Sequence, residues 1–182
     1  MLGLLRGTVV LCTHDASWIA QAAQTIAELK SLLGAAAIAV EHVGSTSVPG
    51  LAAKPILDIV IGVHELSDLD PYVDKLEQMH IHEAGQDLPD QRLFVMGDFE
   101  KNTRTHHIHA VQWDSAAWKN YIRFRDYLLA FDEKRMIYES EKRRLAALYS
   151  RNRQAYTNGK AELIGKLLEE ANRWAEGSDI DG

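Results

Sequence analysis

The feature that most constrains the fold of this chain is a strand, turn and strand pattern between residues 40 and 63. The second predicted strand, residues 56–63, is apolar on both faces except for one carboxylate, Asp58. A strand that is apolar on both faces usually lies in the middle of a covered sheet. A buried carboxylate is costly unless a cation, a metal or strong hydrogen-bond donors compensate it. We therefore expect Asp58 to have such a partner.

Hydrophobic periodicity places strands early in the chain and helices alone after residue 115. The expected strands cover residues 8–11 (an edge strand), 38–43, 56–63, 92–97 and 106–113, with a strand stub and loop over 80–90 and a polar turn over 98–105. The expected helices cover residues 13–33, 67–79, 115–128, 133–149 and 160–174. Strands followed by helices indicate an α+β fold. We expect residues 1–114 to form an α/β core and residues 115–182 a helical segment packed on it as one structural unit.

The bulk properties exclude some classes of function. A formal net charge of −6 over 182 residues argues against a general nucleic-acid binder, although a local basic cluster could still bind a small anionic ligand. The single cysteine, Cys12, cannot form an internal disulfide and fits a reducing cytosol, so we expect a cytoplasmic protein. The apolar N-terminus is too short for a membrane span or a signal sequence, so no membrane partner is expected. The oligomeric state is left open.

The turn between the two strands has the composition of an anion site. Gly44 lets the backbone bend and approach a ligand closely. Exposed N–H groups in such a turn, with the hydroxyls of Ser45 and Thr46, form a concave site for phosphate. A carboxylate on the neighbouring strand, Asp58, could hold a Mg²⁺ ion that bridges phosphate oxygens.

The residues around this turn resemble those of a known family. Gly-Ser followed by an apolar strand bearing Asp is similar to the signature of the DNA polymerase beta-like nucleotidyltransferase superfamily, and the longer string resembles its GrpB branch. The matching segments are residues 41–59, 106–111, 124–128 and 156–160, and the resemblance covers about residues 9–168. It implies a nucleotidyltransferase-like α+β fold, with a small mixed sheet, helices and a C-terminal helical segment.

The same resemblance implies an enzyme that uses a nucleoside triphosphate and a divalent metal (Mg or Mn, with Zn as a further option). The reaction would transfer a nucleotidyl group to a small-molecule acceptor, or activate that acceptor for ligation. Gly44, Ser45 and Thr46 would hold phosphate and Asp58 would ligate the metal. The superfamily usually places a second carboxylate two residues after the first, but here that position is Val60.

A histidine pair is the candidate replacement for the missing carboxylate. His107 and His109 point to one face of their strand, because side chains alternate along a strand. Two imidazoles near Asp58 suit Zn²⁺, Mn²⁺ or Fe²⁺, and they could equally act as acid and base. The structural alternative is a pair of histidines bonded to carboxylates in a half-buried strand.

Five further side chains are candidates for binding phosphate. Lys54 could contact phosphate as a point charge, and Arg104 could bind a terminal phosphate or a substrate carboxylate bidentately. Arg125 would reach inward or form a structural ion pair, and Lys160, beside Tyr156, would add a donor from the helical end. His42 is either a site residue or a hydrogen-bonded strand histidine. The charged run at 139–144 is most simply a solvated helix face.

Two other functions stay open. Val60 in place of an acid favours a catalytically inert module that binds a nucleotide or a coenzyme. A metal-dependent hydrolase built on Asp58 and the histidine pair is the third possibility.

Overall fold

The computed structural model describes residues 2–85 and 90–178. Its strands are β1 (Leu4–Leu5), β2 (Ala39–Val43), β3 (Leu57–Val63), β4 (His82–Gly85), β5 (Gln91–Met96), β6 (Thr103–Arg104) and β7 (His106–Gln112). Its α-helices are α1 (Ser17–Leu33), α2 (Val73–Gln78), α3 (Ala116–Ala130), α4 (Asp132–Leu148) and α5 (Arg153–Ser178), and short 3₁₀ helices cover Gly34–Ala36, Ser45–Ser47 and Leu66–Tyr72.

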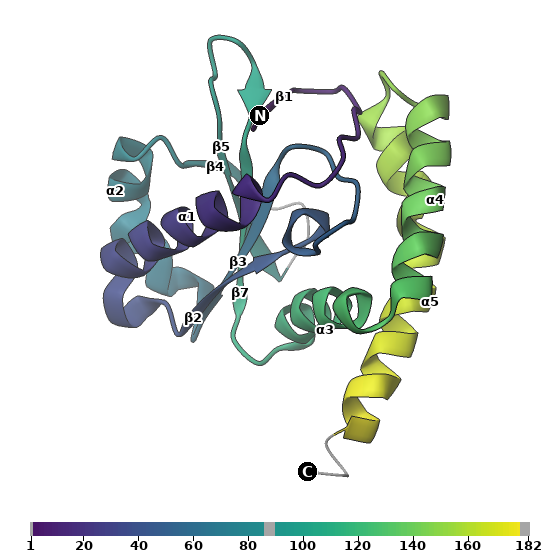
Figure 1. The fold of residues 1–182 in the computed structure, drawn as a ribbon. Helices are drawn as coiled ribbons and strands as arrows, with labels where there is room; N and C mark the ends of the chain where they lie inside the picture. The colour runs from purple at the N-terminus through teal and green to yellow at the C-terminus, as the bar shows by residue number, and fades with distance from the viewer. Residues whose placement is uncertain (1, 86–89, 179–182) are drawn as a thin grey trace.

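Five strands form one mixed sheet in the order β2-β3-β7-β5-β4 (Figure 1). The pair β3 and β7 is parallel, and the other neighbours are antiparallel. β3 therefore lies inside the sheet with neighbours on both sides, as its two apolar faces predict. The register pairs Asp58 with Val43 on one side and with His107 on the other.

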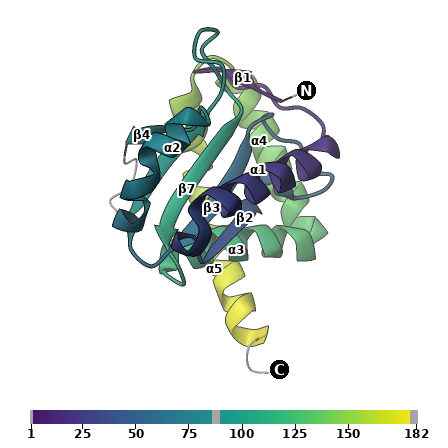
Figure 2. The same cartoon turned by 90° about the vertical axis from the view of Figure 1, so that its left-hand side faces the viewer.

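Helices cover both faces of this sheet, as the two views in Figures 1 and 2 show. On one face, Leu29 and Leu33 of α1 and Leu76 of α2 pack against alternate residues of β3 and β7, including Ile59 and Ile108. On the opposite face, α3 packs through residues such as Trp118 and Ile122 against Val43, Val60 and Val111. Asp58 shares the face of Val60, so it points toward the side of the C-terminal helices.

The three C-terminal helices pack on the loop that follows β2. Val48 and Leu51 of that loop are buried against Tyr127, Tyr138 and Leu167, which come from α3, α4 and α5 respectively. Figure 1 shows α4 and α5 side by side along one edge of the molecule. This packing brings the last two helices against the turn and the carboxylate that the sequence singles out.

The α+β class with a small mixed sheet and a C-terminal helical segment is confirmed, but two elements differ from expectation. The edge strand predicted over residues 8–11 is wrong, because the Val9 backbone N–H bonds the carbonyl of Ser150 (2.8 Å) and no strand forms there. Instead β1, nearer the N-terminus, pairs with β6, which lies inside the stretch predicted as a polar turn.

The last helix begins at Arg153, seven residues before the predicted start. Gly159 reads as a helix breaker, yet it is required by packing, since a Cβ there would lie 2.7 Å from Leu145 Cδ2 of α4. The predicted strand stub over 80–90 contains β4, and residues 86–89 lie outside the described part of the chain. No helix within residues 2–85 and 90–178 is both long enough and apolar enough to cross a bilayer.

Candidate functional site

The predicted turn and the predicted carboxylate lie in direct contact. Gly44 has φ +71°, a conformation that favours glycine, and a Cβ built on it would lie 2.6 Å from Asp58 Oδ2. Gly44 precedes the 3₁₀ turn of Ser45–Ser47, whose geometry is closed by the Ser47 hydroxyl donating to the Gly44 carbonyl (2.6 Å). Only a residue without a side chain therefore lets the backbone of the turn approach the acid.

Asp58 belongs to a chain of polar contacts that ends in the last helix. His107 Nδ1 lies 3.2 Å from Asp58 Oδ1, and Arg153 donates from its guanidinium to His107 Nε2 at 3.1 Å. Because arginine is always a donor, Nε2 accepts and the imidazole carries its proton on Nδ1, facing the carboxylate. Burial would raise the pKa of Asp58, but the hydrogen bond from His107 and nearby positive charges, including Lys54, lower it to about 2. Asp58 is thus ionised and hydrogen-bonded.

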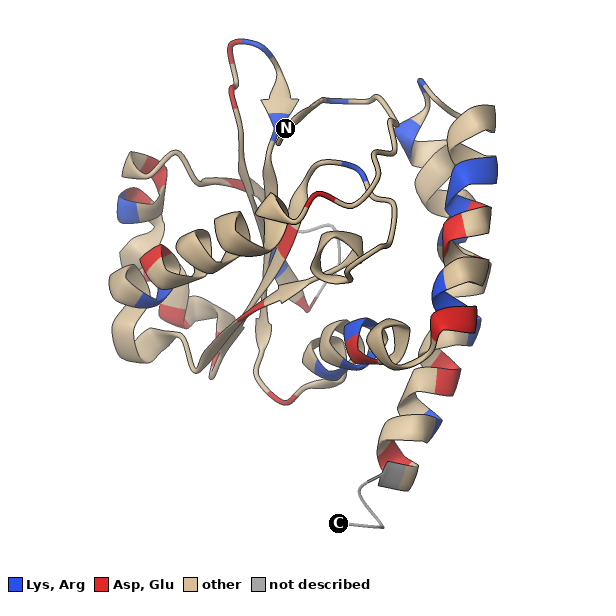
Figure 3. Ribbon diagram, in the orientation of Figure 1, with Lys and Arg blue, Asp and Glu red and all other residues tan. Residues whose placement is uncertain are grey.

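A cavity of about 240 Å³ opens beside this chain of contacts. It is lined by the turn, the loop before β3, one face of β3 and β7, and the helices α4 and α5; its charged and histidine residues are Lys54, Asp58, His107, His109, Lys142, Arg153 and Lys160. Figure 3 shows lysine and arginine spaced along the C-terminal helices that form one wall. Among the described residues that line the cavity, four are cations and Asp58 is the one acid.

Three of these cations are lysines whose charge is poorly solvated. Lys142 is 2% exposed and donates to Ser45 Oγ (3.0 Å) and to the Ala52 carbonyl. Burial, with the positive charge of Lys160, lowers the pKa of Lys142 to about 7. Burial likewise lowers the pKa values of Lys54 and Lys160 to about 8. Each ammonium group therefore lacks full compensation within the protein.

Aromatic rings hold these lysines in place. The Tyr156 ring lies 4.5 Å from Lys160 Nζ and 5.6 Å from Lys54 Nζ, and the Tyr138 ring lies 4.8 Å from Lys142 Nζ. Such cation–π contacts compensate a charge by about 0.5 to 2 kcal/mol each. The amino groups are thus oriented around the cavity without being neutralised by carboxylates.

The structure brings together eight of the eleven residues that the sequence suggested. Those that line the cavity are Gly44, Ser45, Thr46, Lys54, Asp58, His107, His109 and Lys160. Arg104 is not among them; its guanidinium stacks on Phe99, 4.3 Å from the ring centroid, in a neighbouring cavity.

Arg125 and His42 also lie outside the cavity lining. Arg125 takes the structural alternative, because it pairs with Glu41 (3.0 Å) and Asp126 (2.8 Å) and donates to the His42 carbonyl. His42 points to the α1 side of β2, where its Nε2 lies 2.9 Å from Thr46 Oγ1. Burial lowers the pKa of His42 to about 4, so it is a neutral partner that supports the turn.

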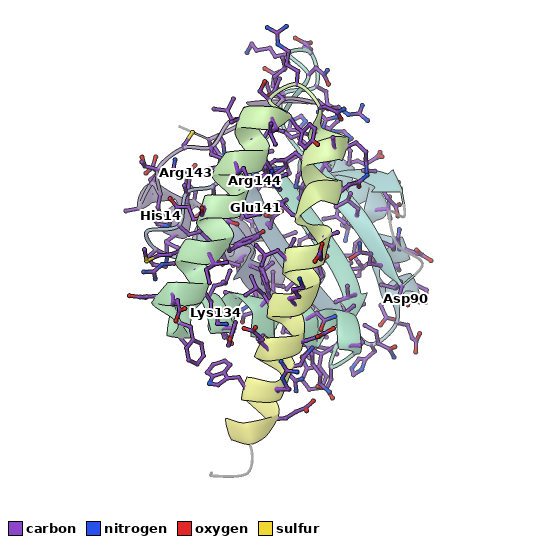
Figure 4. The ribbon with its side chains drawn as sticks, turned by 90° about the vertical axis from the view of Figure 1, so that its right-hand side faces the viewer. His14, Asp90, Lys134, Glu141, Arg143 and Arg144 are labelled. Carbon is purple, nitrogen blue, oxygen red and sulfur yellow. The ribbon has the colours of Figure 1, made fainter. Side chains whose placement is uncertain are left out.

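Sequence reasoning missed Lys142 and Arg153. The expectation that 139–144 is a solvated face is wrong for Lys142, although Glu141, Arg143 and Arg144 do lie on the outward side of α4 (Figure 4). The spacing of Tyr138, Lys142 and Leu145 follows one helical face and could have revealed the buried lysine. Arg153 had no such signal, because its segment was not predicted to be helical.

The donor set does not form a ready-made metal site. Within residues 2–85 and 90–178, no group of three or more His, Cys, Asp or Glu side chains could hold a metal ion. Asp58 Oδ1 is engaged by His107, and the other charged groups lining the cavity are cations, which repel a divalent ion. Asp58, His107 and His109 would hold a metal only if His107 released its contacts with Asp58 and Arg153, and metal binding stays a prediction.

Fold and site together define an α+β protein with a small mixed sheet and a cation-lined cavity beside one buried carboxylate. The chain belongs to the GrpB family: the model of the family described as GrpB protein matches residues 8–170. This confirms the family identified from the sequence.

Two relatives named GrpB agree with this assignment. The glutamate-rich protein GrpB of Alkalihalophilus pseudofirmus is 32% identical over 173 residues, which cover 93% of this chain and 99% of the relative. The crystal structure of the conserved protein GrpB from Enterococcus faecalis aligns with a TM-score of 0.84 and 30% identity, over 91% of this chain and 99% of that one. A cytoplasmic RNA terminal U-transferase aligns weakly, with a TM-score of 0.46 and 9% identity over 72% of this chain and 43% of that one.

Proposed function

We propose that the cavity binds the phosphate groups of a nucleoside triphosphate and that the protein transfers the nucleotidyl group to a small-molecule acceptor. The observation that supports this most is the imbalance of charge in the cavity. Lys54, Lys142, Arg153 and Lys160 face a single carboxylate, Asp58, which leaves a formal excess of three positive charges when all are ionised.

A polyanion is the ligand that best complements this cavity. Burial without a counter-charge lowers the pKa of all three lysines, and an anion bound among them would restore their charged forms. The backbone of the Gly44 turn and the hydroxyl of Ser45 add donors at the same place. A triphosphate supplies about four negative charges in a compact group, whereas a neutral metabolite would leave the lysines uncompensated.

The same groups suit the chemistry of nucleotidyl transfer. Phosphoryl chemistry depends mainly on positioning and on stabilising the charge that develops on the phosphate oxygens. Lysines and an arginine arranged around the cavity can supply that stabilisation. Asp58 and His107 would orient Arg153 through the contacts described above, and no step of this proposal requires a resident metal.

The test measures nucleotide binding and turnover in matched variants. Lys142→Met and Lys160→Met each remove one charged donor to phosphate, worth about 1.5 to 3 kcal/mol, so we expect the Kd for ATP to rise roughly tenfold to a hundredfold. Lys166→Met is the control, because Lys166 lies on the outside of α5 and pairs with Glu162. Release of pyrophosphate from α-labelled ATP, with pooled small-molecule acceptors and Mg²⁺ or Mn²⁺, would measure transfer. Equal ATP affinity in all three variants would refute the assignment.

A catalytically inert nucleotide- or coenzyme-binding module is the second candidate, and Val60 is the observation that favours it. Val60 is fully buried against Val43, Val111 and Trp118 beneath α3, so this position has neither a carboxylate nor room for one. Calorimetry separates the candidates: tight ATP binding that Asp58→Ala leaves unchanged, without any pyrophosphate release, would support the module.

A further inference from the structure

A second and larger cavity, of about 940 Å³, adjoins the first one. His107, Arg153 and Thr157 line both cavities. The hydrogen bond from Arg153 to His107 Nε2 (3.1 Å) therefore lies between the two spaces. Two adjoining cavities that share these residues are the arrangement expected where two substrates meet.

Three guanidinium groups line the second cavity. They come from distant parts of the chain: Arg6 follows β1, Arg104 lies on β6, and Arg153 begins α5. No carboxylate of the described residues pairs with any of them. The acid that does line this cavity, Glu83, is already bound by Arg92 through two hydrogen bonds of 2.7 and 3.0 Å.

Arg6 and Arg153 lie close enough to Arg104 to disfavour its charge. Partial burial lowers the pKa of Arg104, and the positive charges of Arg6 and Arg153 lower it further. Arg104 is held by its own contacts, since it donates to the Thr103 carbonyl (2.8 Å) and stacks on the Phe99 ring. His82 also packs edge-on against the Phe99 ring, with 4.5 Å between the ring centroids. The cavity thus combines two cations held by contacts, Arg104 and Arg153, with the partly exposed ring of Phe99.

We propose that this second cavity is the acceptor site, and that it takes a small organic acid whose carboxylate lies between Arg104 and Arg153. This inference deepens the proposed function and rests on it for the reaction. Arginine forks match carboxylate geometry, and an apolar or aromatic part of the acid would lie against Phe99. A second anionic group of the same molecule would reach Arg6.

The reaction then follows without a general base. A carboxylate oxygen of the acid attacks the α-phosphorus of the nucleotide, the bond from that phosphorus to the bridging oxygen breaks, and pyrophosphate leaves with the bond electrons. The products are an acyl nucleotide anhydride and pyrophosphate, and no proton has to be removed from the acceptor. This suits the site, because His107 Nε2 is occupied by Arg153 and His107 Nδ1 faces Asp58. An alcohol acceptor would instead need a free base.

The test titrates citrate, and separately inorganic phosphate, into the nucleotide-free protein by calorimetry. Arg104→Gln and Arg6→Gln should each weaken citrate binding roughly tenfold or more, since each removes a charged donor. Arg6 is exposed, so its variant keeps the test valid if Arg104→Gln fails to fold. Lys142→Met separates the two cavities, because it would weaken citrate bound among the lysines but not citrate held by the arginines of the second cavity. Arg144→Gln is the control, because Arg144 is exposed and pairs with Glu141 on the outer face of α4.

Each outcome decides the inference. Citrate binding lost in the arginine variants and kept in Lys142→Met supports an organic-acid site distinct from the lysine cavity. Absence of citrate binding, binding of phosphate alone, or loss of citrate binding in Lys142→Met would overturn it. ATP binding is measured separately: citrate bound at Arg104 in a protein that binds no ATP would refute the proposed function and support the organic-acid site.

Discussion

The buried lysine of the first cavity gives an unusual prediction about stability and pH. Lys142 has a pKa of about 7 in the folded protein, because burial disfavours its charged form, against 10.5 for an ordinary lysine. Between these values the unfolded chain binds more protons than the folded one, so the free energy of unfolding rises with pH. Integrating this difference for one group from about pH 7 to about pH 9 gives roughly 2 kcal/mol.

The effect is isolated by comparing wild type with Lys142→Met. Urea unfolding at both pH values, in a buffer without phosphate, gives the free energy of unfolding for each protein by linear extrapolation. The variant should be the more stable protein at pH 7, since it has no buried charge to solvate. Its advantage should shrink by roughly 2 kcal/mol at pH 9, where the wild-type lysine is neutral in the folded state.

A control variant and a measurement with ATP test whether Lys142 causes this pH dependence. Lys166→Met, at an exposed position, should show no change in its difference from wild type over the same range. Saturating ATP should flatten the pH dependence of wild type, because bound phosphate would keep Lys142 charged. If the wild-type and Lys142→Met values stay parallel from pH 7 to pH 9, the reasoning about a poorly compensated lysine is refuted.

Two other substitutions test the scaffold of the site. Gly44→Ala forces a side chain into a glycine conformation and against Asp58, so thermal unfolding should show a loss of about 1 to 3 kcal/mol from the backbone alone, together with weaker ATP binding. Gly165→Ala is its control, because nothing lies within 4 Å of a Cβ there and helix propensity predicts a gain of about 0.5 to 1 kcal/mol; equal stability of the two variants would contradict this account. Arg92→Met removes the ion pairs to Glu83 and Asp70, whose carboxylates are 32% and 67% exposed and stay solvated, so urea unfolding should show a loss of only about 1 kcal/mol, and a loss of about 3 kcal/mol or more would contradict this account.

The sequence was most informative where pattern and packing agree. The apolar run around Asp58 predicted a central strand, and β3 does lie between β2 and β7. The sequence also predicted that the glycine turn and the carboxylate lie together, and the antiparallel pairing of Val43 with Asp58 brings them together across the long loop between β2 and β3. The predicted helix start at residue 115 also agrees with the structure, where the Ser115 hydroxyl caps α3 by accepting the Trp118 N–H at 3.2 Å.

Lys142, Arg153 and the second cavity depend on packing between distant segments, which local sequence patterns do not predict. Lys142 has the sequence context of a surface helix, and only the docking of α4 on the loop at Ala52 buries it. Arg153 begins a helix whose first turns contain Gly159, so local propensity argued against that helix. The second cavity depends on the pairing of β1 with β6, two strands of two residues each that are brought together across about a hundred residues of chain.

The first cavity is built from segments that lie far apart in the chain, and this determines when during synthesis the protein can bind an anion there. The turn, the acid and Lys54 come from the first third of the chain, whereas Lys142, Arg153 and Lys160 come from α4 and α5. A nascent polypeptide that ends before α4 contains the carboxylate with only one of its four cationic partners. Affinity of the first cavity for an anion would therefore appear only after synthesis of the last two helices, so a metabolite bound there would select finished molecules over partial ones.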